Sequence, residues 1–173
     1  MCGECLARPP AFRATLAAVT YDHPVDAWVK ALKYRSVLAA GRALGSLLAD
    51  RLRFSPAPDL VVPMPLAAGR QRERGFNQVL ELVAQLPPEL SSRMEARVLV
   101  RARDTVAQAG LPLEERRRNV SGAFQVTGSL KGLRVALVDD VMTTGATADA
   151  AAAALTAAGA ESVDVWVVAR ALR

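Results

Sequence analysis

Hydrophobic positions along the chain fall into short runs of two kinds, separated by polar loops. Some recur every three or four residues, as on one face of a helix, and others are continuous, as in a strand buried on both faces. The helical spacing predicts helices at Val25–Tyr34, Leu38–Leu52, Gly75 to about Leu86, and Thr147–Ala158. The continuous runs predict strands at Thr15–Tyr21, Asp59–Pro63, Val98–Val100, Ala123–Val126, Leu133–Val138 and Val163–Val168.

The order of these elements predicts the fold class. Strands that alternate with helices, and that are apolar along their whole length, are typical of an α/β fold with a mostly parallel sheet flanked by helices. We expect Asp59–Pro63, Leu133–Val138 and Val163–Val168 to be neighbouring parallel strands. In such sheets ligands bind beyond the carboxyl ends of the strands, so candidate chemistry is sought there.

The segment Val135–Thr147 has the strongest chemical pattern in the chain. Two carboxylates, Asp139 and Asp140, follow a buried strand, and the run Thr143, Thr144, Gly145, Ala146 and Thr147 then opens a helix. The N-terminus of a helix favours an anion, glycine lets the backbone approach a phosphate closely, and threonine hydroxyls add donors. The carboxylates are acceptors for the two hydroxyls of a ribose, so the segment predicts a site for a ribose 5-phosphate.

A simpler interpretation remains open, in which the two aspartates only end a strand and the threonines only cap a helix. No Gly-Lys-Ser/Thr follows, so the segment is not a Walker loop. On the ribose interpretation, Asp140 and Gly145 lie at the rim of the sheet and not in its core. We therefore expect substitutions there to weaken ligand binding and to leave the fold intact.

Composition and charge add few further constraints. The chain has 173 residues, 51% of them hydrophobic, and a net charge of +5 with nearly all cations arginine. This charge suits a phosphorylated metabolite, a nucleic acid or an acidic surface, although arginine in place of lysine also arises in GC-rich genomes. The eight aromatic residues do not interleave with an arginine cluster, so strong binding of single-stranded DNA is not supported. No apolar run approaches the roughly 20 residues of a membrane helix and no secretory signal is evident, so we expect a cytoplasmic protein without membrane insertion.

Two further segments carry open interpretations. Arg101–Asn119 is rich in arginine and poor in apolar residues, which predicts a long mobile loop that is either functional or simply disordered. Leu32–Arg35 either contributes cations to a site or merely ends a helix with cations near its negative pole.

Cys2 and Cys5 form a C-x-x-C pair, but a structural zinc takes four ligands and the only histidine is His23. The cysteines are thus half of a zinc site, and we expect no zinc in an isolated chain.

Six parts of the chain together resemble the ComF branch of the type I phosphoribosyltransferases, which is named for DNA uptake in competent bacteria and includes GntX-like proteins. They are Cys2–Cys5, Leu32–Arg35, Val62–Leu66, Arg74–Gln78, Arg103–Gln108 with Arg116–Asn119, and Val135–Thr147. They follow one another over almost the whole chain. Val135–Thr147 resembles the phosphoribosyl-pyrophosphate motif of the superfamily, and Arg74–Gln78 with the later Gln108 resembles the branch.

The resemblance implies a type I phosphoribosyltransferase fold with a flexible hood loop. It also implies binding of 5-phosphoribosyl-1-pyrophosphate with Mg²⁺ and transfer of the phosphoribosyl group to a nitrogen acceptor. The catalytic residues would be Asp139 and Asp140, and the phosphoribosyl-binding residues Thr143, Thr144, Gly145, Ala146 and Thr147. The pyrophosphate loop would include Pro65, Leu66, Arg74 and Asn77, and the hood loop Arg103, Thr105, Gln108, Arg117 and Asn119.

The same resemblance bears on domains and partners. Family members begin with a four-cysteine zinc element, so residues 1–14 would be a remnant of it and residues 15–173 the phosphoribosyltransferase domain. Either the native start lies upstream, or this member has lost its zinc. The family is tied to the handling of incoming single-stranded DNA with helicase and recombination partners. An alternative is therefore a protein that binds phosphoribosyl pyrophosphate without catalysis, or an accessory protein of DNA uptake that acts through protein partners.

Overall fold

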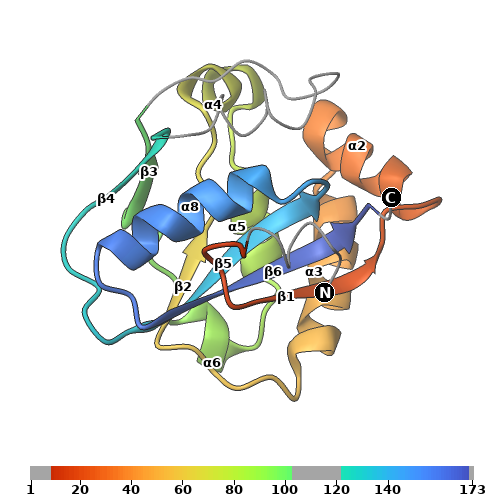
Figure 1. The fold of residues 1–173 in the computed structure, drawn as a ribbon. Helices are drawn as coiled ribbons and strands as arrows, with labels where there is room; N and C mark the ends of the chain where they lie inside the picture. Colours follow the sequence, from red (N-terminus) through yellow and green to blue (C-terminus); the bar gives the residue numbers. More distant parts are fainter. Residues whose placement is uncertain (1–8, 103–121, 172–173) are drawn as a thin grey trace.

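The computed structural model describes residues 9–102 and 122–171, drawn in colour in Figure 1. The elements run in the order β1 (Ala14–Thr20), α2 (Val25–Arg35), α3 (Leu38–Leu52), β2 (Leu60–Pro63), α4 (Ala68–Arg74), α5 (Gln78–Val83), α6 (Pro88–Ser91), β3 (Leu99–Arg101), β4 (Phe124–Val126), β5 (Arg134–Met142), α8 (Ala146–Ala157) and β6 (Ser162–Arg170). Cys2, Cys5 and the hood-loop residues Arg103, Thr105, Gln108, Arg117 and Asn119 lie outside the described residues. Most of the segment 1–14 does too, so the domain division stays a prediction.

A four-stranded sheet of order β1-β6-β5-β2 forms the centre of the molecule, and each neighbouring pair is parallel. The predicted parallel neighbours β2, β5 and β6 are confirmed. Strands β3 and β4 form a separate antiparallel pair that projects to one side (Figure 1). The α/β class with a mostly parallel sheet is therefore confirmed.

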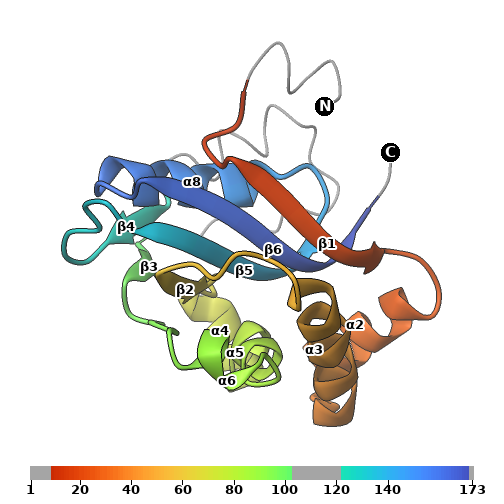
Figure 2. The same cartoon turned by 90° about the horizontal axis from the view of Figure 1, so that it is seen from below.

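Helices cover both faces of this sheet, as Figure 2 shows, with α8 on one face and α2, α3 and α5 on the other. Residues 135–138 of β5 are all buried, because successive side chains point to opposite faces and both faces are covered. Leu44 and Leu48 of α3 and Leu155 of α8 are fully buried against the two faces. Each such leucine contributes about 1.5–3 kcal/mol of burial free energy, which holds the three layers together.

The region after β2 differs from the prediction. A polar loop was expected, but α4 forms there, and no residue of α4 is buried, so it lacks the hydrophobic period that would reveal it. Gly75 ends α4 in the left-handed conformation (φ 77°), and Asn77, two residues later, caps α5. The prediction that Gly75 opens a helix reaching Leu86 was wrong, since α5 ends at Val83 and the short α6 follows.

Strand β5 is longer than predicted and changes the setting of the two carboxylates. It continues through Asp139 and Asp140, because its pairing with β6 extends to Met142 opposite Arg170. Its pairing with β2 ends earlier, at Val138 opposite Pro63. The two aspartates thus lie inside a strand, at the level where one neighbouring strand has stopped. Alternation along the strand directs their side chains to opposite faces of the sheet.

None of the helices within residues 9–102 and 122–171 has the length and hydropathy that a membrane span requires.

Candidate functional site

A cavity of about 100 Å³ opens at the carboxyl end of β5, between that strand and the start of α8. It is lined by Asp139, Val141, Met142, Thr143, Thr144, Gly145, Ala146, Thr147, Ala148 and Val167. Folding therefore brings Asp139 and all five predicted phosphoribosyl-binding residues around one cavity. This is the edge of a parallel sheet at which ligands bind in α/β folds.

The turn before α8 has the geometry of an anion site. Gly145 is the N-cap residue of α8 and adopts φ 82°, a left-handed conformation that glycine tolerates without strain. A Cβ placed on Gly145 would come no closer than 3.8 Å to the protein, at Met142 Sδ. The space beside this backbone is thus open, and the N–H groups of the first turn of α8 are oriented to receive a phosphate. Thr144 Oγ1 accepts a bond of 3.3 Å from the N–H of Ala146 and steadies this turn.

Asp139 provides the acidic wall of the cavity. Its Oδ1 accepts a 2.8 Å bond from the backbone N–H of Asp140, which lies beyond the last residue of β2 paired with β5. Burial, and secondarily the charge of Asp140, raise the pKa of Asp139 to about 7, while Lys33 opposes the shift. Asp139 is therefore a carboxyl group close to the balance between its neutral and ionised forms at neutral pH.

Asp140 faces the opposite side of the sheet, where α2 and α5 pack. It is 4% exposed, and its oxygens are engaged by two side chains. Lys33 Nζ of α2 lies 2.8 Å from Oδ1, and Gln78 Nε2 of α5 lies 2.8 Å from Oδ2. The backbone N–H of Val141 also donates to Oδ1 at 2.6 Å. Asp140 is consequently part of the buried frame of the site, and the expectation that it lies at the rim was wrong, because α2 and α5 cover it.

The charge of Lys33 is held in place by this arrangement. Burial alone would lower the pKa of the Lys33 ammonium, but the charge and hydrogen bond of Asp140, with the charge of Asp139, raise that pKa above its ordinary value. Lys33 thus stays protonated and balances one of two adjacent carboxylates.

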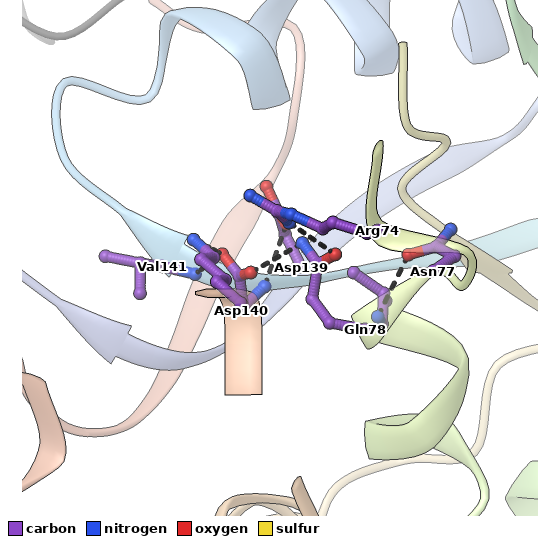
Figure 3. A network of polar contacts seen from close by, with 8 residues as sticks. Arg74, Asn77, Gln78, Asp139, Asp140 and Val141 are labelled. Atoms are coloured by element: carbon purple, nitrogen blue, oxygen red, sulfur yellow. Dashed lines mark hydrogen bonds and ion pairs between the residues drawn. The ribbon is translucent and has the colours of Figure 1, made fainter. Parts of the chain in front are cut away.

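The predicted pyrophosphate loop lies next to this network (Figure 3). Pro65 and Leu66 follow β2 and are partly buried. Arg74 Nη1 donates to Gln78 Oε1 at 2.8 Å, and its guanidinium carbon lies 5.6 Å from the centre of the Tyr34 ring. Asn77 has a framework role, since its Nδ2 donates to the Met64 carbonyl at 3.0 Å and its Oδ1 accepts from the N–H of Val79 at 3.0 Å.

Sequence reasoning did not single out Lys33 and Gln78 as site residues. Lys33 was named only within Leu32–Arg35, a segment expected either to contribute cations to a site or to end a helix. In the structure its Nζ contacts Asp140, 107 positions away in the sequence. Gln78 appeared only inside the Arg74–Gln78 motif. A signal was available, because Gln78 is a polar residue on the helix face that buries Val79, Leu82 and Val83. A polar side chain in such a position requires a buried partner.

The described residues contain no group of three or more histidine, cysteine or acidic side chains that could enclose a metal ion. Mg²⁺, however, is usually held by one or two carboxylates together with phosphate oxygens of the substrate and several waters. Of the two carboxylates, Asp139 lines the cavity and matches such a donor, whereas Asp140 is buried on the other face against Lys33 and Gln78.

Comparison with known proteins identifies the family. The family model for the phosphoribosyl transferase domain matches residues 36–173, which include the cavity, Asp140 with its partner Gln78, and the loop after β2. Lys33 lies just before the matched residues. The chain belongs to the phosphoribosyltransferase family. Its relatives place this chain in the ComF branch, as the resemblance of its motifs predicted, and the type I fold with a mostly parallel sheet agrees with that assignment.

The relatives share most of the chain. DNA utilization protein YhgH of Salmonella typhi is 36% identical over 177 residues, which cover 99% of this chain and 78% of that protein. Competence protein F of Haemophilus influenzae is 33% identical, over 98% of this chain and 78% of that protein. Competence protein ComFC of Streptococcus pneumoniae is 27% identical, over 89% of this chain and 67% of that protein.

Proposed function

We propose that this phosphoribosyltransferase-family protein binds 5-phosphoribosyl-1-pyrophosphate with Mg²⁺ and transfers the phosphoribosyl group to a nitrogen acceptor. The observation that supports the proposal is the cavity that both Asp139 and the Thr143–Thr147 turn line. An acceptor for sugar hydroxyls and a cradle for a phosphate are thereby combined in one small site.

The roles follow from the position of each group. The first-turn N–H groups of α8 and the hydroxyls of Thr143, Thr144 and Thr147 would bind the 5-phosphate. Asp139 would accept a bond from a ribose hydroxyl. Asp140 would pair with Lys33 on the other face of the sheet. It could contact the ribose only through lone pairs that Lys33 and Gln78 do not already occupy.

The pyrophosphate would lie on the β2 side of the cavity, against the backbone of Pro65 and Leu66 and near Arg74. During transfer the bond between C1 of the ribose and the pyrophosphate oxygen breaks, and the acceptor nitrogen bonds to C1. Positive charge develops on the sugar as it does in glycoside cleavage, and negative charge collects on the pyrophosphate. Asp139 would help to hold Mg²⁺, which would supply charge neutralisation to the leaving pyrophosphate, and Arg74 would add a fixed cation.

Calorimetric titration of the purified chain with phosphoribosyl pyrophosphate, with and without Mg²⁺, tests binding. We expect saturable one-site binding that needs Mg²⁺, and weaker binding of ribose 5-phosphate, which lacks the pyrophosphate. Release of pyrophosphate in a panel of purine, pyrimidine and amine acceptors then tests transfer. Absence of binding at millimolar ligand with Mg²⁺ present would overturn the proposal.

A second candidate retains the site but not the chemistry. The names of the relatives, DNA utilization protein and competence protein, favour a role in DNA uptake, in which the chain binds the ligand and acts through helicase or recombination partners in the cytoplasm. Binding of phosphoribosyl pyrophosphate without pyrophosphate release from any acceptor would favour this candidate. A salt titration of single-stranded DNA binding tests direct contact with DNA, for which we expect only weak affinity that falls steeply with salt.

A further inference from the structure

Two polar residues, Gln78 and Asp140, stand out among the described residues. They are the only polar or charged residues of residues 9–102 and 122–171 that are buried, each at 4% exposure, and they bond to each other. With Lys33 and Arg74 they form a continuous run, from Lys33 Nζ to Asp140, from Asp140 to Gln78 and from Gln78 Oε1 to Arg74 Nη1. We call these four residues the Asp140 network; Arg74, Gln78 and Asp140 are labelled in Figure 3.

Stability alone gives little reason for this network. Removing a cation and a carboxylate from water costs several kcal/mol per ion, and well-packed apolar residues in place of a buried pair are often as stable or more so. Gln78 lies on the face of α5 that also buries Val79, Leu82 and Val83, so an apolar side chain at its position would match its neighbours on the helix. The polar groups are therefore more readily explained by the geometry that they impose.

That geometry extends to both ends of the candidate site. On the sugar side, the N–H of Asp140 donates to Asp139 Oδ1, so the orientation of the Asp140 peptide sets the orientation of the carboxylate that lines the cavity. On the pyrophosphate side, Gln78 Oε1 accepts a hydrogen bond from the guanidinium of Arg74. Arg74 is the last residue of α4, the helix that comes after the loop following β2. Gln78 bonds to Asp140 through its Nε2 and to Arg74 through its Oε1, so it joins the two sides.

Resting on the proposed function, we propose that Gln78 and Lys33 are positioning residues: Lys33 orients Asp140 and through it Asp139, and Gln78 links Asp140 to Arg74, the cation on the pyrophosphate side. Neither side chain touches the ligand. The two halves of the site are then fixed relative to each other before phosphoribosyl pyrophosphate binds, which is the condition for productive geometry in a preorganised site.

Three ligands test the two halves of the site separately and together. They are phosphoribosyl pyrophosphate, ribose 5-phosphate and pyrophosphate, each titrated with Mg²⁺ by calorimetry. The variants are Lys33→Met, Gln78→Met and Arg74→Met, whose replacement is unbranched and close in length to each original side chain. Leu90→Ala is the control, because Leu90 is a buried residue of α6, remote from the network, and its loss lowers stability without affecting the site. Melting temperatures are recorded for every variant.

We expect Lys33→Met to weaken the binding of ribose 5-phosphate about tenfold and to change the binding of pyrophosphate little. Arg74→Met should weaken pyrophosphate binding and leave ribose 5-phosphate binding nearly unchanged. Gln78→Met should weaken all three ligands, and the Arg74→Met/Gln78→Met double variant should lose less affinity for phosphoribosyl pyrophosphate than the two single losses combined. A purely structural role predicts instead that Gln78→Met lowers the melting temperature and keeps wild-type affinities, as Leu90→Ala does.

The outcomes separate the two proposals. If wild-type protein binds phosphoribosyl pyrophosphate and Gln78→Met binds all three ligands as wild type does, the positioning role is overturned and the proposed function stands. If the wild type binds none of the ligands, the proposed function itself fails. Should Lys33→Met not fold, Gln78→Met decides the question by itself, because in that variant Asp140 keeps its ion pair with Lys33.

Discussion

Lys33 and Asp140 are separated by 107 positions in the sequence, yet their charged groups lie 2.8 Å apart on the covered face of the sheet. The pair joins the end of α2 to the carboxyl-terminal part of β5. Because its side chains are only 20% and 6% exposed, it differs in kind from the surface pairs of this protein. Its consequences for stability and binding lead to the following predictions.

Asp140→Ala should destabilise the fold strongly, contrary to what the sequence suggested for a residue at the rim. The substitution leaves the Lys33 cation and the Gln78 amide buried without their acceptor, which we expect to lower the free energy of unfolding by about 3–5 kcal/mol. Urea denaturation measures this change. Asp50→Ala, which removes an exposed pair with Arg53 at 3.2 Å, is the control and should cost less than about 1 kcal/mol. Equal effects of the two substitutions would contradict the buried role of Asp140.

Gly145→Val should abolish ligand binding, but it will also strain the backbone, since a branched residue at φ 82° is disfavoured. Gly128→Val is the control that separates backbone strain from loss of the site. Gly128 also has a positive φ, 87°, with no atom within 4 Å of an added Cβ, and it lies outside the site. At a hundredfold its dissociation constant, phosphoribosyl pyrophosphate with Mg²⁺ should stabilise wild type and Gly128→Val by about 2.7 kcal/mol. Gly145→Val should melt at nearly the same temperature with and without the ligand. A ligand shift in Gly145→Val as large as in Gly128→Val would remove the phosphate site from this turn.

Asp139 should make stability depend on pH in the direction opposite to most carboxylates. Its pKa of about 7 in the folded protein exceeds the value of about 3.9 expected in the unfolded chain, so the folded state binds more protons between pH 4 and 7. This contribution to the free energy of unfolding therefore increases as the pH falls through that window. Asp59, whose pKa is lowered by its hydrogen bonds from Arg134, loses its stabilising contribution only as the pH falls below about 4.

Asp139→Asn tests the effect of this titration. We expect it to raise the free energy of unfolding at pH 8 by about 1–2 kcal/mol and to change it little at pH 5, while weakening ligand binding. Asp50→Asn, on the exposed face of α3, should leave the pH dependence unaltered. If Asp139→Asn keeps the wild-type pH profile between 5 and 8, another group is responsible for it.

Asn77 should matter through two separable bonds. Asn77→Ala removes both the cap of α5 and the bond to the Met64 carbonyl, with an expected cost of about 1–2 kcal/mol. Asn77→Asp keeps the acceptor for the Val79 N–H, loses the donor to Met64 and adds a negative charge. We expect the aspartate variant to recover most of the stability but not the affinity for pyrophosphate, because the loop after β2 is released. Recovery of both would show that the bond to Met64 is dispensable for the loop.

The sequence was sufficient to predict most helices and strands and most of the residues that line the cavity. Continuous apolar runs and helical spacing predicted β2, β6, α2, α3 and α8 close to their observed bounds, and the start of β5, because each element must bury a face whose period is set by its own geometry. The run Thr143–Thr147 after Asp139 predicted the turn and its neighbours at the cavity, because these residues adjoin one another in the chain. The motifs also identified the family.

Only the tertiary structure decided which carboxylate faces which partner. A shift of one residue along a strand turns a side chain to the other face, so the full length of β5 and the early end of β2 determine that Asp139 lines the cavity and Asp140 is buried. Helix α4 was hidden for a related reason, since a helix that buries none of its residues leaves no hydrophobic period. The contacts of Lys33 and Gln78 with Asp140 join α2, α5 and β5 across long separations in sequence, and such contacts arise from the packing of layers, which no local pattern encodes.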